Sequence, residues 1–456
     1  MTSTFVGLPG SRAAALQSFT AMLDRIASIR KAHQLIGPMV FAAVLVWALG
    51  AFSPAWGQPA RTITVAPDGP IATLTEAVAQ AQPGDRILLT AGTYREPTVV
   101  IDKPLTLEGQ GDPVLDGEGE RQLLHVRADS VTIRGLVLRN VGTSFVEDRA
   151  AIKIEESRGC VVEHNRIIDG FFGIWVGKSQ GCRITHNTLE AHKTRESISG
   201  NGIHLWYCAD MDVAHNTIDG HRDGIYFEFV EDSRITNNDS VGNLRYGLHF
   251  MYSDYCRYEG NLFRDNGAGV AVMFTRHVEM VNNRFEHNWG SAAYGLLLKD
   301  IYDSTVAHNT FDTNTIGIYS ENSSRIDIHH NAFRDNGWGV KIMANSIDNR
   351  FTDNNFIGNS FDVITNSQQS NSTFAHNYWD KYDGYDLNRD GVGDVPFHPV
   401  RLFAYLVEQN EPAVILMRSL FVQLLDAAER VLPAITPKAL VDERPAMSRI
   451  QLTRTP

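Results

Sequence analysis

The sequence predicts an all-β chain folded as a right-handed parallel β-helix, a solenoid with about 22 residues per coil. A near-identical phrase that contains asparagine recurs along the chain at intervals of 22 to 29 residues. A unit this short cannot bury its apolar face alone, so successive units must stack on one another. The phrases place their asparagines at Asn165, Asn187, Asn216, Asn238, Asn261, Asn283, Asn309, Asn331, Asn354 and Asn377.

Two strand signals lie in each repeat. The first strand ends at the asparagine and carries an apolar residue three positions before it, such as Ile184 before Asn187. The second strand opens with glycine and alternates, as in G-I-H-L from Gly202 and G-L-H-F from Gly247. Period-two alternation between glycine and asparagine indicates strand–turn–strand units. Asparagine also tolerates the left-handed turn conformation, and stacked amides can hydrogen-bond from coil to coil.

Residues 1–57 are predicted to be a signal peptide with a long N-terminal lead. An apolar run covers residues 35–52, and small residues surround Gly57. We expect cleavage near Gly57, with Met22 as an alternative start, and an uncleaved anchor helix is the other interpretation. The chain is exported in either case. The basic residues before the apolar run are Arg25, Arg30 and Lys31.

The β-helix domain is expected over residues 61–399, with a helical cap at its start. Thr73 and Glu76 have the spacing of a capping box, which predicts a short helix that ends near Ala81. This stretch resembles the N-terminal cap of pectate-lyase-like β-helices.

A C-terminal amphipathic helix is expected from Asn410 to about Arg430, within residues 400–435, and a tail of residues 436–456 follows. Its apolar positions cover far more than half of the circumference, a wider face than the end of one coil needs. Two interpretations stay open. The helix is a cap on the last coil, or an interfacial helix in peripheral contact with a membrane or a partner.

The charge of the chain excludes one class of partner. The formal net charge is −12, and no basic patch interleaved with aromatic residues is present in the sequence. Because phosphate binding needs clustered Lys and Arg, we expect no nucleic-acid partner.

Export places the four cysteines in an oxidising compartment. Cys160 and Cys182 each lie five residues before successive ladder asparagines, so they should stack on adjacent coils. Strand spacing allows a disulfide there, and a ladder of reduced thiols is the equal alternative.

The outward positions of the glycine-led strands carry a candidate copper site. Residues two and four after each glycine point away from the core, because side chains alternate along a strand. This places His249, Met251 and Met273 within a few ångströms of one another, with His204 two coils away. Exposed thioethers beside imidazole form the soft ligand set that favours Cu(I). A chance grouping of surface residues is the alternative.

A second histidine row immediately precedes ladder asparagines. Stacked imidazoles have the ligand character that Zn or Cu requires. Recurrence along the whole helix instead favours a turn preference that is copied with the repeat, and we prefer that interpretation. The row contains His164, His186, His215, His308, His330 and His376.

An acidic loop over residues 386–394 is a candidate Ca²⁺ site. It has oxygen ligands at positions 1, 3, 5 and 9 of a calcium loop and glycine at position 6, whereas position 12 is Phe397 and not glutamate. A structural Ca²⁺ ion and a polar turn without an ion are both compatible with this pattern. The oxygen ligands are Asp386, Asn388, Asp390 and Asp394.

A polysaccharide-active lyase, epimerase or hydrolase is the alternative function, because β-helices often carry such enzymes. These enzymes need paired carboxylates or a basic residue in a groove. The sequence contains no compact carboxylate pair, so we expect a non-catalytic protein. Outward groups that could serve an enzyme are Asp223, Glu228, Arg245 and Tyr246.

Longer strings carry a more specific resemblance. R-Y-G-L-H-F-M-Y-S-D over residues 245–254, N-G-A-G-V-A-V-M-F over 266–274 and E-P-A-V-I-L-M-R-S-L-F over 411–421 resemble the NosD family. The resemblance covers essentially the whole exported chain. It implies a periplasmic accessory protein that handles copper during the maturation of nitrous oxide reductase. The implied partners are an ABC transporter permease and its ATPase, a copper-chaperone lipoprotein and the reductase itself.

The resemblance also implies that the C-terminal helix lies near the permease. The assignment of His249, Met251 and Met273 as copper ligands rests on the repeat geometry and not on the family. Whether copper passes through this chain, or the chain couples ATPase motion to the reductase, stays open at this point.

Overall fold

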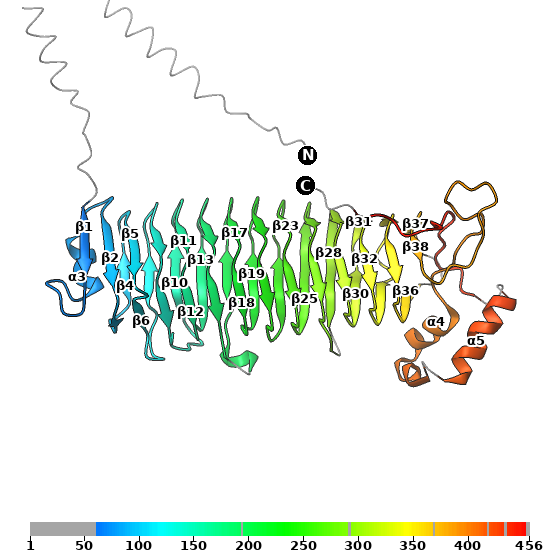
Figure 1. Ribbon diagram of the computed structural model, residues 1–456, viewed down its shortest axis with the longest axis horizontal. Helices are drawn as coiled ribbons and strands as arrows, with labels where there is room; N and C mark the ends of the chain where they lie inside the picture. The colour runs from blue at the N-terminus through cyan, green and yellow to red at the C-terminus, as the bar shows by residue number, and fades with distance from the viewer. Residues whose placement is uncertain are drawn as a thin grey trace, which may run out of the picture. The chain divides into compact units, whose positions relative to one another are not determined.

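The computed structural model describes residues 61–192, 195–290, 293–367, 370–416, 419–432 and 436–452. The predicted signal peptide lies outside the described residues. From Arg61 onward the chain forms one unit, a parallel β-solenoid whose coils follow one another in sequence order (Figure 1). The predicted parallel β-helix is confirmed.

Three faces run along this solenoid, and all strand pairings within them are parallel. Face 1 contains the glycine-led strands, face 2 contains the strands that end at the ladder asparagines, and face 3 contains the strands that follow those asparagines. Faces 1 and 2 form one 25-stranded sheet because strand β28 runs through both, and face 3 is a separate 13-stranded sheet.

Face 1 consists of β4 (Val99–Ile101), β7 (Leu124–Val126), β10 (Ala150–Glu155), β13 (Phe172–Gly177), β16 (Ile203–Trp206), β19 (Asp223–Glu228), β22 (Tyr246–Met251), β25 (Ala268–Arg276), β28 (Tyr294–Ala307), β30 (Ile316–Glu321), β33 (Trp338–Ile342) and β36 (Phe361–Thr365). Face 2 consists of β1 (Thr62–Val65), β2 (Arg86–Thr90), β5 (Thr106–Gln110), β8 (Thr132–Arg134), β11 (Val161–Glu163), β14 (Arg183–Thr185), β17 (Asp212–Ala214), β20 (Arg234–Thr236), β23 (Arg257–Glu259), β26 (Glu279–Val281), the end of β28, β31 (Ser324–His329), β34 (Arg350–Thr352) and β37 (Thr373–Ala375). Face 3 consists of β3 (Thr93–Tyr94), β6 (Val114–Asp116), β9 (Val137–Arg139), β12 (Arg166–Ile168), β15 (Thr188–Glu190), β18 (Thr217–Asp219), β21 (Asp239–Val241), β24 (Leu262–Arg264), β27 (Arg284–Glu286), β29 (Thr310–Asp312), β32 (Ala332–Arg334), β35 (Asn355–Ile357) and β38 (Tyr378–Trp379).

The ten predicted asparagines form a continuous buried ladder in the turn between faces 2 and 3. Each of the first nine donates its backbone and side-chain N–H groups to the side-chain oxygen of the next asparagine, as Asn261 does to Asn283 at 3.0 and 2.9 Å. The left-handed residue of this turn is not the asparagine but the residue before it, such as His186 at φ 56°. The expectation for the turn is therefore corrected by one position, because the ladder needs the asparagine side chain to point inward.

A second asparagine ladder lies in the turn between faces 3 and 1. Its members follow the first ladder at a fixed distance of five residues, and each bonds to the next as in the first ladder. His221 occupies the equivalent position one coil before this ladder, and its backbone N–H donates to the side-chain oxygen of Asn243 at 3.1 Å. The ladder consists of Asn243, Asn266, Asn288, Asn314, Asn336 and Asn359.

Stacked aromatic rings fill the core behind face 3. Successive ring centroids lie 4.2 to 5.5 Å apart, with ring planes within 26° of parallel. Burial of each ring stabilises the fold by about 1.5–3 kcal/mol, so this row binds each coil to the next. The rings belong to Phe263, Phe285, Phe311, Phe333, Phe356 and Trp379.

The predicted N-terminal cap is confirmed. Helix α3 (Leu74–Gln80) begins after Thr73, whose hydroxyl accepts a hydrogen bond from the backbone of Glu76 at 3.2 Å. Leu74, Ala77 and Val78 are buried and join the core of the solenoid.

The predicted C-terminal amphipathic helix is present, but it is shorter than expected and does not begin at Asn410. The chain instead forms α4 (Leu402–Gln409), the 3₁₀ helix η2 (Glu411–Leu416) and α5 (Leu420–Val431), and a short 3₁₀ helix η1 (Glu196–Ile198) lies far from them in the sequence. Proline at position 412 lacks the backbone N–H that would continue α4, and Ser419 caps a new helix by accepting from the backbone of Val422. No helix among the described residues is long and apolar enough to cross a membrane.

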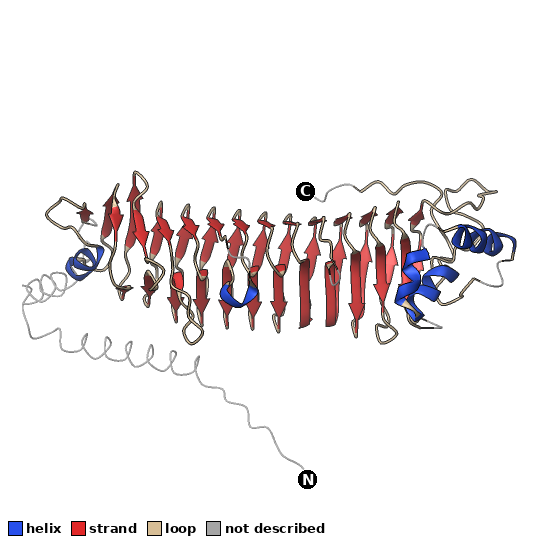
Figure 2. Cartoon of the chain, turned by 90° about the horizontal axis from the view of Figure 1, so that it is seen from below, coloured by secondary structure: helices blue, strands red, loops and turns tan. Residues whose placement is uncertain are grey.

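Helices α4 and α5 pack on the side of face 1 at the C-terminal end of the solenoid (Figure 2). Phe403 and Val407 of α4 contact Phe361 and Ile364 of β36, and Val422 of α5 joins the same cluster. An ion pair of 2.8 Å between Lys341 and Glu408 adds to this contact.

The C-terminal tail closes the last coil. Asp442 takes the place of an asparagine at the end of the first ladder and accepts from the backbone and side chain of Asn377 and from the indole of Trp379, at 3.1 Å each. Further along, Ile450 exchanges two backbone–amide bonds of 2.9 Å with Asn355. The last coil is therefore capped by residues 436–452 of the predicted tail, and not by the helix that was one candidate for this cap.

Candidate functional site

The predicted thioether pair lies on adjacent strands of face 1. Met251 is the Cα partner of Met273 across β22 and β25, and both side chains are partly exposed. The hydroxyl of Tyr226, one coil earlier, lies 3.7 Å from the sulfur of Met251 and can donate to it. Burial raises the pKa of Tyr226 to about 12, so this hydroxyl keeps its proton at neutral pH. The structure places the two methionines at paired positions of adjacent strands, as the repeat count predicted.

His249 lies on the same strand but is not exposed as expected. Its side chain is only 8% accessible, because the rings of Tyr226 and Tyr246 pack on it with centroids 4.8 Å away. Its Nδ1 atom lies 3.3 Å from the guanidinium of Arg245 and 3.6 Å from the carboxylate of Asp223. Among the described residues Nε2 has no hydrogen-bond partner, although it is buried. The side chain of His249 therefore points away from the core of the solenoid without being exposed to solvent.

Asp223 holds the charge that orients His249. The carboxylate is fully buried and lies 2.8 Å from Nε of Arg245. Burial alone would raise the pKa of Asp223, but its interactions with His249 and Arg245 outweigh that effect and hold the pKa below its ordinary value. A metal-binding histidine usually has one ring nitrogen fixed by such a neighbour, which leaves the other nitrogen for the ion.

His204 is separated from the thioether pair. The ring of Tyr226 lies between His204 and His249, with centroids 4.7 Å from the first and 4.8 Å from the second. Nδ1 of His204 lies 3.0 Å from the amide of Asn201. Burial lowers the pKa of His204 to about 3, so the ring is neutral at any physiological pH. The structure places His204 two strands away from His249, as expected, and does not bring it to Met251 or Met273.

The acidic loop folds onto its own backbone. Asp386 accepts from the backbone of Gly391 at 2.8 Å, Asp390 from Val392 at 2.9 Å, and Asp394 from Leu387 at 2.6 Å. Asn388 accepts from the backbone of Asp390 at 3.0 Å. These carboxylates do not gather as a three-ligand group in the described part of the chain. A structural Ca²⁺ ion in this loop stays a prediction.

All four cysteines are buried free thiols. Cys160 and Cys182 lie on adjacent coils, as expected, and form the reduced ladder that was one of the two alternatives. Burial raises the pKa of Cys208 to about 11 and that of Cys256 to about 12, which keeps these thiols protonated and unreactive.

The histidine row divides into different environments. His164, His186 and His215 are exposed and stack with centroids 4.9 Å apart and ring planes within 24° of parallel. All six members of the row have left-handed backbone, with φ of 54° to 58°, which agrees with a turn preference. His308 and His330 differ from the first three because a further histidine, His329, lies beside them. The doubled histidine before Asn331 was the sequence signal for this difference.

Comparison with known proteins gives one family. Residues 190–384 match the family described as "Periplasmic copper-binding protein (NosD)". A Pseudomonas aeruginosa protein named "Probable ABC transporter binding protein NosD" is 31% identical over 420 residues, which cover 85% of this chain and 97% of that protein. A Stutzerimonas stutzeri protein of the same name is 26% identical over 383 residues, which cover 80% and 87% of the two chains.

Solved structures agree on the fold alone. The catalytic unit of a thermostable GH87 α-1,3-glucanase from Streptomyces thermodiastaticus has a TM-score of 0.53 at 14% identity and covers 72% of this chain and 68% of its own. A family 28 exopolygalacturonase from Yersinia enterocolitica has a TM-score of 0.51 at 12% identity, with coverage of 69% and 77%. The match to the Pseudomonas protein spans nearly its whole length at 31% identity. This chain therefore belongs to the NosD family.

Proposed function

We propose that this chain is a periplasmic, non-enzymatic accessory protein that binds copper and serves the maturation of nitrous oxide reductase together with an ABC transporter. The description of its family and the names of its relatives support copper, the periplasm and a transporter. The N-terminal signal pattern supports export. The observation that carries the proposal is the pairing of Met251 with Met273 beside His249.

Copper is the cargo in this proposal, held as Cu(I) by two thioethers and one imidazole. Soft sulfur ligands favour Cu(I) over hard ions. Partial exposure of Met251 and Met273 leaves the cargo accessible to a partner, while buried His249 approaches from the protein side. Asp223 and Arg245 are positioning residues that fix Nδ1 of His249 and leave Nε2 for the ion. His204 is assigned no primary role, because Tyr226 separates it from the sulfurs.

Competition with a chromogenic chelator under anaerobic conditions tests this site. The variant Met251→Leu/Met273→Leu removes both sulfurs with little change of volume, and we expect its Cu(I) affinity to fall at least tenfold. Met447→Leu, which removes a partly exposed sulfur far along the sequence, is the matched control. Equal Cu(I) affinity in the double variant and the wild type would exclude these ligands.

The C-terminal helices are the proposed attachment to the membrane side of the assembly. Leu420, Leu424 and Val431 of α5 are 69%, 61% and 78% exposed, whereas Val422 is buried against α4. An exposed apolar face of this kind suits the interface of a bilayer. We expect Leu420→Ser/Leu424→Ser to lower co-flotation with lipid vesicles severalfold while Cu(I) binding is unchanged. Equal flotation of the variant and the wild type would contradict the membrane contact.

We expect this protein not to cleave polysaccharides. Asp223 and Arg245, two of the outward groups that could serve an enzyme, are engaged with each other and with His249. Reducing-end and unsaturated-product assays on uronate polymers should give no turnover. Turnover that Asp223→Asn abolishes would favour the enzyme alternative instead.

A further inference from the structure

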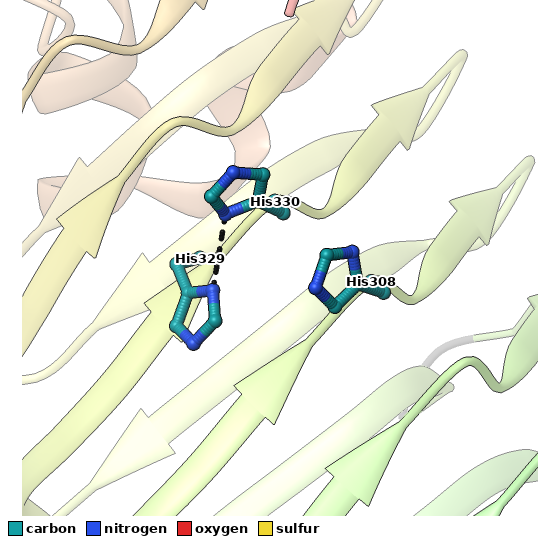
Figure 3. A group of neighbouring side chains, drawn as sticks. All are labelled: His308, His329 and His330. Carbon is teal, nitrogen blue, oxygen red and sulfur yellow. Dashed lines mark hydrogen bonds between the residues drawn. The ribbon is translucent and has the colours of Figure 1, made fainter. Parts of the chain in front are cut away.

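Three histidines meet at the edge between faces 2 and 3, toward the C-terminal end of the solenoid. His308 follows β28, while His329 ends β31 and His330 follows it. Ala307 is the Cα partner of His329, and the backbone N–H of His308 donates to the carbonyl of His329 at 3.2 Å. The pairing of adjacent coils therefore fixes the three side chains beside one another (Figure 3).

The ring nitrogens of this trio converge. One nitrogen from each ring lies within 4.8 Å of the other two, and Nδ1 of His329 lies 3.1 Å from Nδ1 of His330. A tetrahedral ion with nitrogen ligands at 2.0–2.1 Å spaces those ligands about 3.3 Å apart, so small ring rotations would complete such a site. The ring of His329 crosses those of His308 and His330 at 86° and 88°, whereas His308 and His330 are tilted by 31° to each other. The three rings therefore do not form a parallel stack.

A buried nitrogen of the trio has no hydrogen-bond partner among the described residues. Nδ1 of His308 is buried, and no hydrogen bond reaches it in the described part of the chain. A buried polar atom without a partner costs about 1–3 kcal/mol, so native structures rarely leave one without a reason. A bound cation would satisfy this nitrogen together with the other two.

Two carboxylates, each with a partner of its own, lie near the trio. Asp327 and Asp353 lie close enough to affect His329, with Arg350 paired to Asp327 at 3.0 Å and His376 paired to Asp353 at 2.5 Å.

We propose that His308, His329 and His330 bind one borderline divalent cation, Zn²⁺ or Cu²⁺, through three imidazole nitrogens. Three nitrogens without sulfur or carboxylate ligands select borderline ions over Ca²⁺ and over soft Cu(I). The fourth position is left to water or to a ligand from a partner. This site is separate from the proposed thioether site and does not depend on it.

The repeat itself supplies conservative variants for a test. The exported full-length chain is titrated with Zn²⁺ and, separately, with Cu²⁺ in competition with a chelator of known affinity. His329→Thr copies its Cα partner Thr352, and His330→Asn copies the residue before Asn283. His186→Asn makes the same change in the exposed stack and is the matched control.

We expect one equivalent of Zn²⁺ or Cu²⁺ in the wild type, and at least a tenfold loss of affinity in His329→Thr and His330→Asn but not in His186→Asn. Co²⁺ should give the strong visible absorption of a tetrahedral site in the wild type alone. Met251→Leu/Met273→Leu should leave Zn²⁺ and Cu²⁺ binding at the trio unchanged. Loss of the trio site can therefore be distinguished from loss of the proposed Cu(I) site. Equal affinity in all variants, or no binding by the wild type at micromolar metal, would overturn the proposal.

Discussion

Two groups of histidines occupy the same repeat position yet have different surroundings. In the N-terminal group, His164, His186 and His215 stack in parallel on the exposed edge. In the C-terminal group, His308 and His330 meet His329 in a half-buried, crossed arrangement. A single additional residue, at the position that holds Thr185 in the first group, separates a stack from a convergent set of ligands.

A solenoid repeat therefore provides equivalent positions for side chains, but it does not by itself create a binding site at each of them. The backbone conformation is the same in both groups, since every histidine of the row is left-handed. Chemistry arises only where neighbouring outward positions are also filled by the right residue types.

The largest effect is expected from breaking the first asparagine ladder, which lies beside both groups of histidines. Asn187→Ala and Asn309→Ala each delete side-chain bonds to the next asparagine and to a backbone carbonyl. Because several buried groups lose their partners, we expect each variant to lose about 3 kcal/mol or more of unfolding free energy in urea titration. Gln423→Ala on the exposed side of α5 is the control. A large loss of unfolding free energy in only one of the two variants would show that the ladder does not support both groups equally.

A pH effect is expected from an interior histidine that belongs to neither group. Burial lowers the pKa of His221 to about 4, below its ordinary value of 6.5. Between these values the unfolded chain binds a proton that the folded chain does not, so stability falls as the pH drops from about 6.5 to about 4, by up to about 3 kcal/mol. His221→Asn, which copies the second ladder, should remove this part of the pH dependence. Urea titrations at pH 7 and pH 4.5 compare the two proteins, and an unchanged pH slope would contradict the assignment.

A third histidine can be introduced into the N-terminal group to create a metal site there. Thr185→His places a third imidazole beside His164 and His186, in the arrangement that His329 has beside His308 and His330. We expect Zn²⁺ affinity at this edge to rise about tenfold, or about 1.4 kcal/mol, measured by competition titration in a His329→Thr background. Thr236→His, which has only His215 nearby, is the control. An equal gain in both variants would show that the number of neighbouring histidines is unimportant, because Thr185 and Thr236 occupy the same position of the repeat.

The smallest effect is expected within the stack. His186→Asn removes one ring from between His164 and His215 but keeps a residue that tolerates φ of 56°. Loss of two exposed ring contacts should cost about 1 kcal/mol or less, which appears as a small shift of Tm. A loss as large as that of Asn187→Ala would mean that the stack, and not the ladder, holds this edge together.

Much of the fold could be predicted because the repeat carries information from coil to coil. The first asparagine ladder and the pairing of Met251 with Met273 follow from counting residues within each coil. The second ladder, five residues after the first, was not predicted, although its asparagines stand at a regular distance from the first ladder. The left-handed position was misplaced by one residue because both residues of the His–Asn pair are compatible with such a turn.

The sites could be predicted only in part, since they depend on contacts that cross between positions. Burial of His249 results from the rings of Tyr226 and Tyr246 and from Asp223. Tyr226 is its Cα partner on the preceding coil, but residue spacing does not show how closely these side chains pack. The trio depends on ring orientation, which residue spacing does not contain. The closing segment around Asp442 was missed for another reason, because it lacks the repeat that it completes.

Asp442 gives the first ladder a polar direction. Every asparagine side chain points its N–H toward the C-terminal neighbour, so the amide dipoles align along the solenoid as peptide dipoles do in a helix. The positive end of this array falls at the last coil, where Asp442 provides an acceptor with a full negative charge and no N–H that would itself need a partner. The ladder thus behaves as one long dipole with its counter-charge built into the chain.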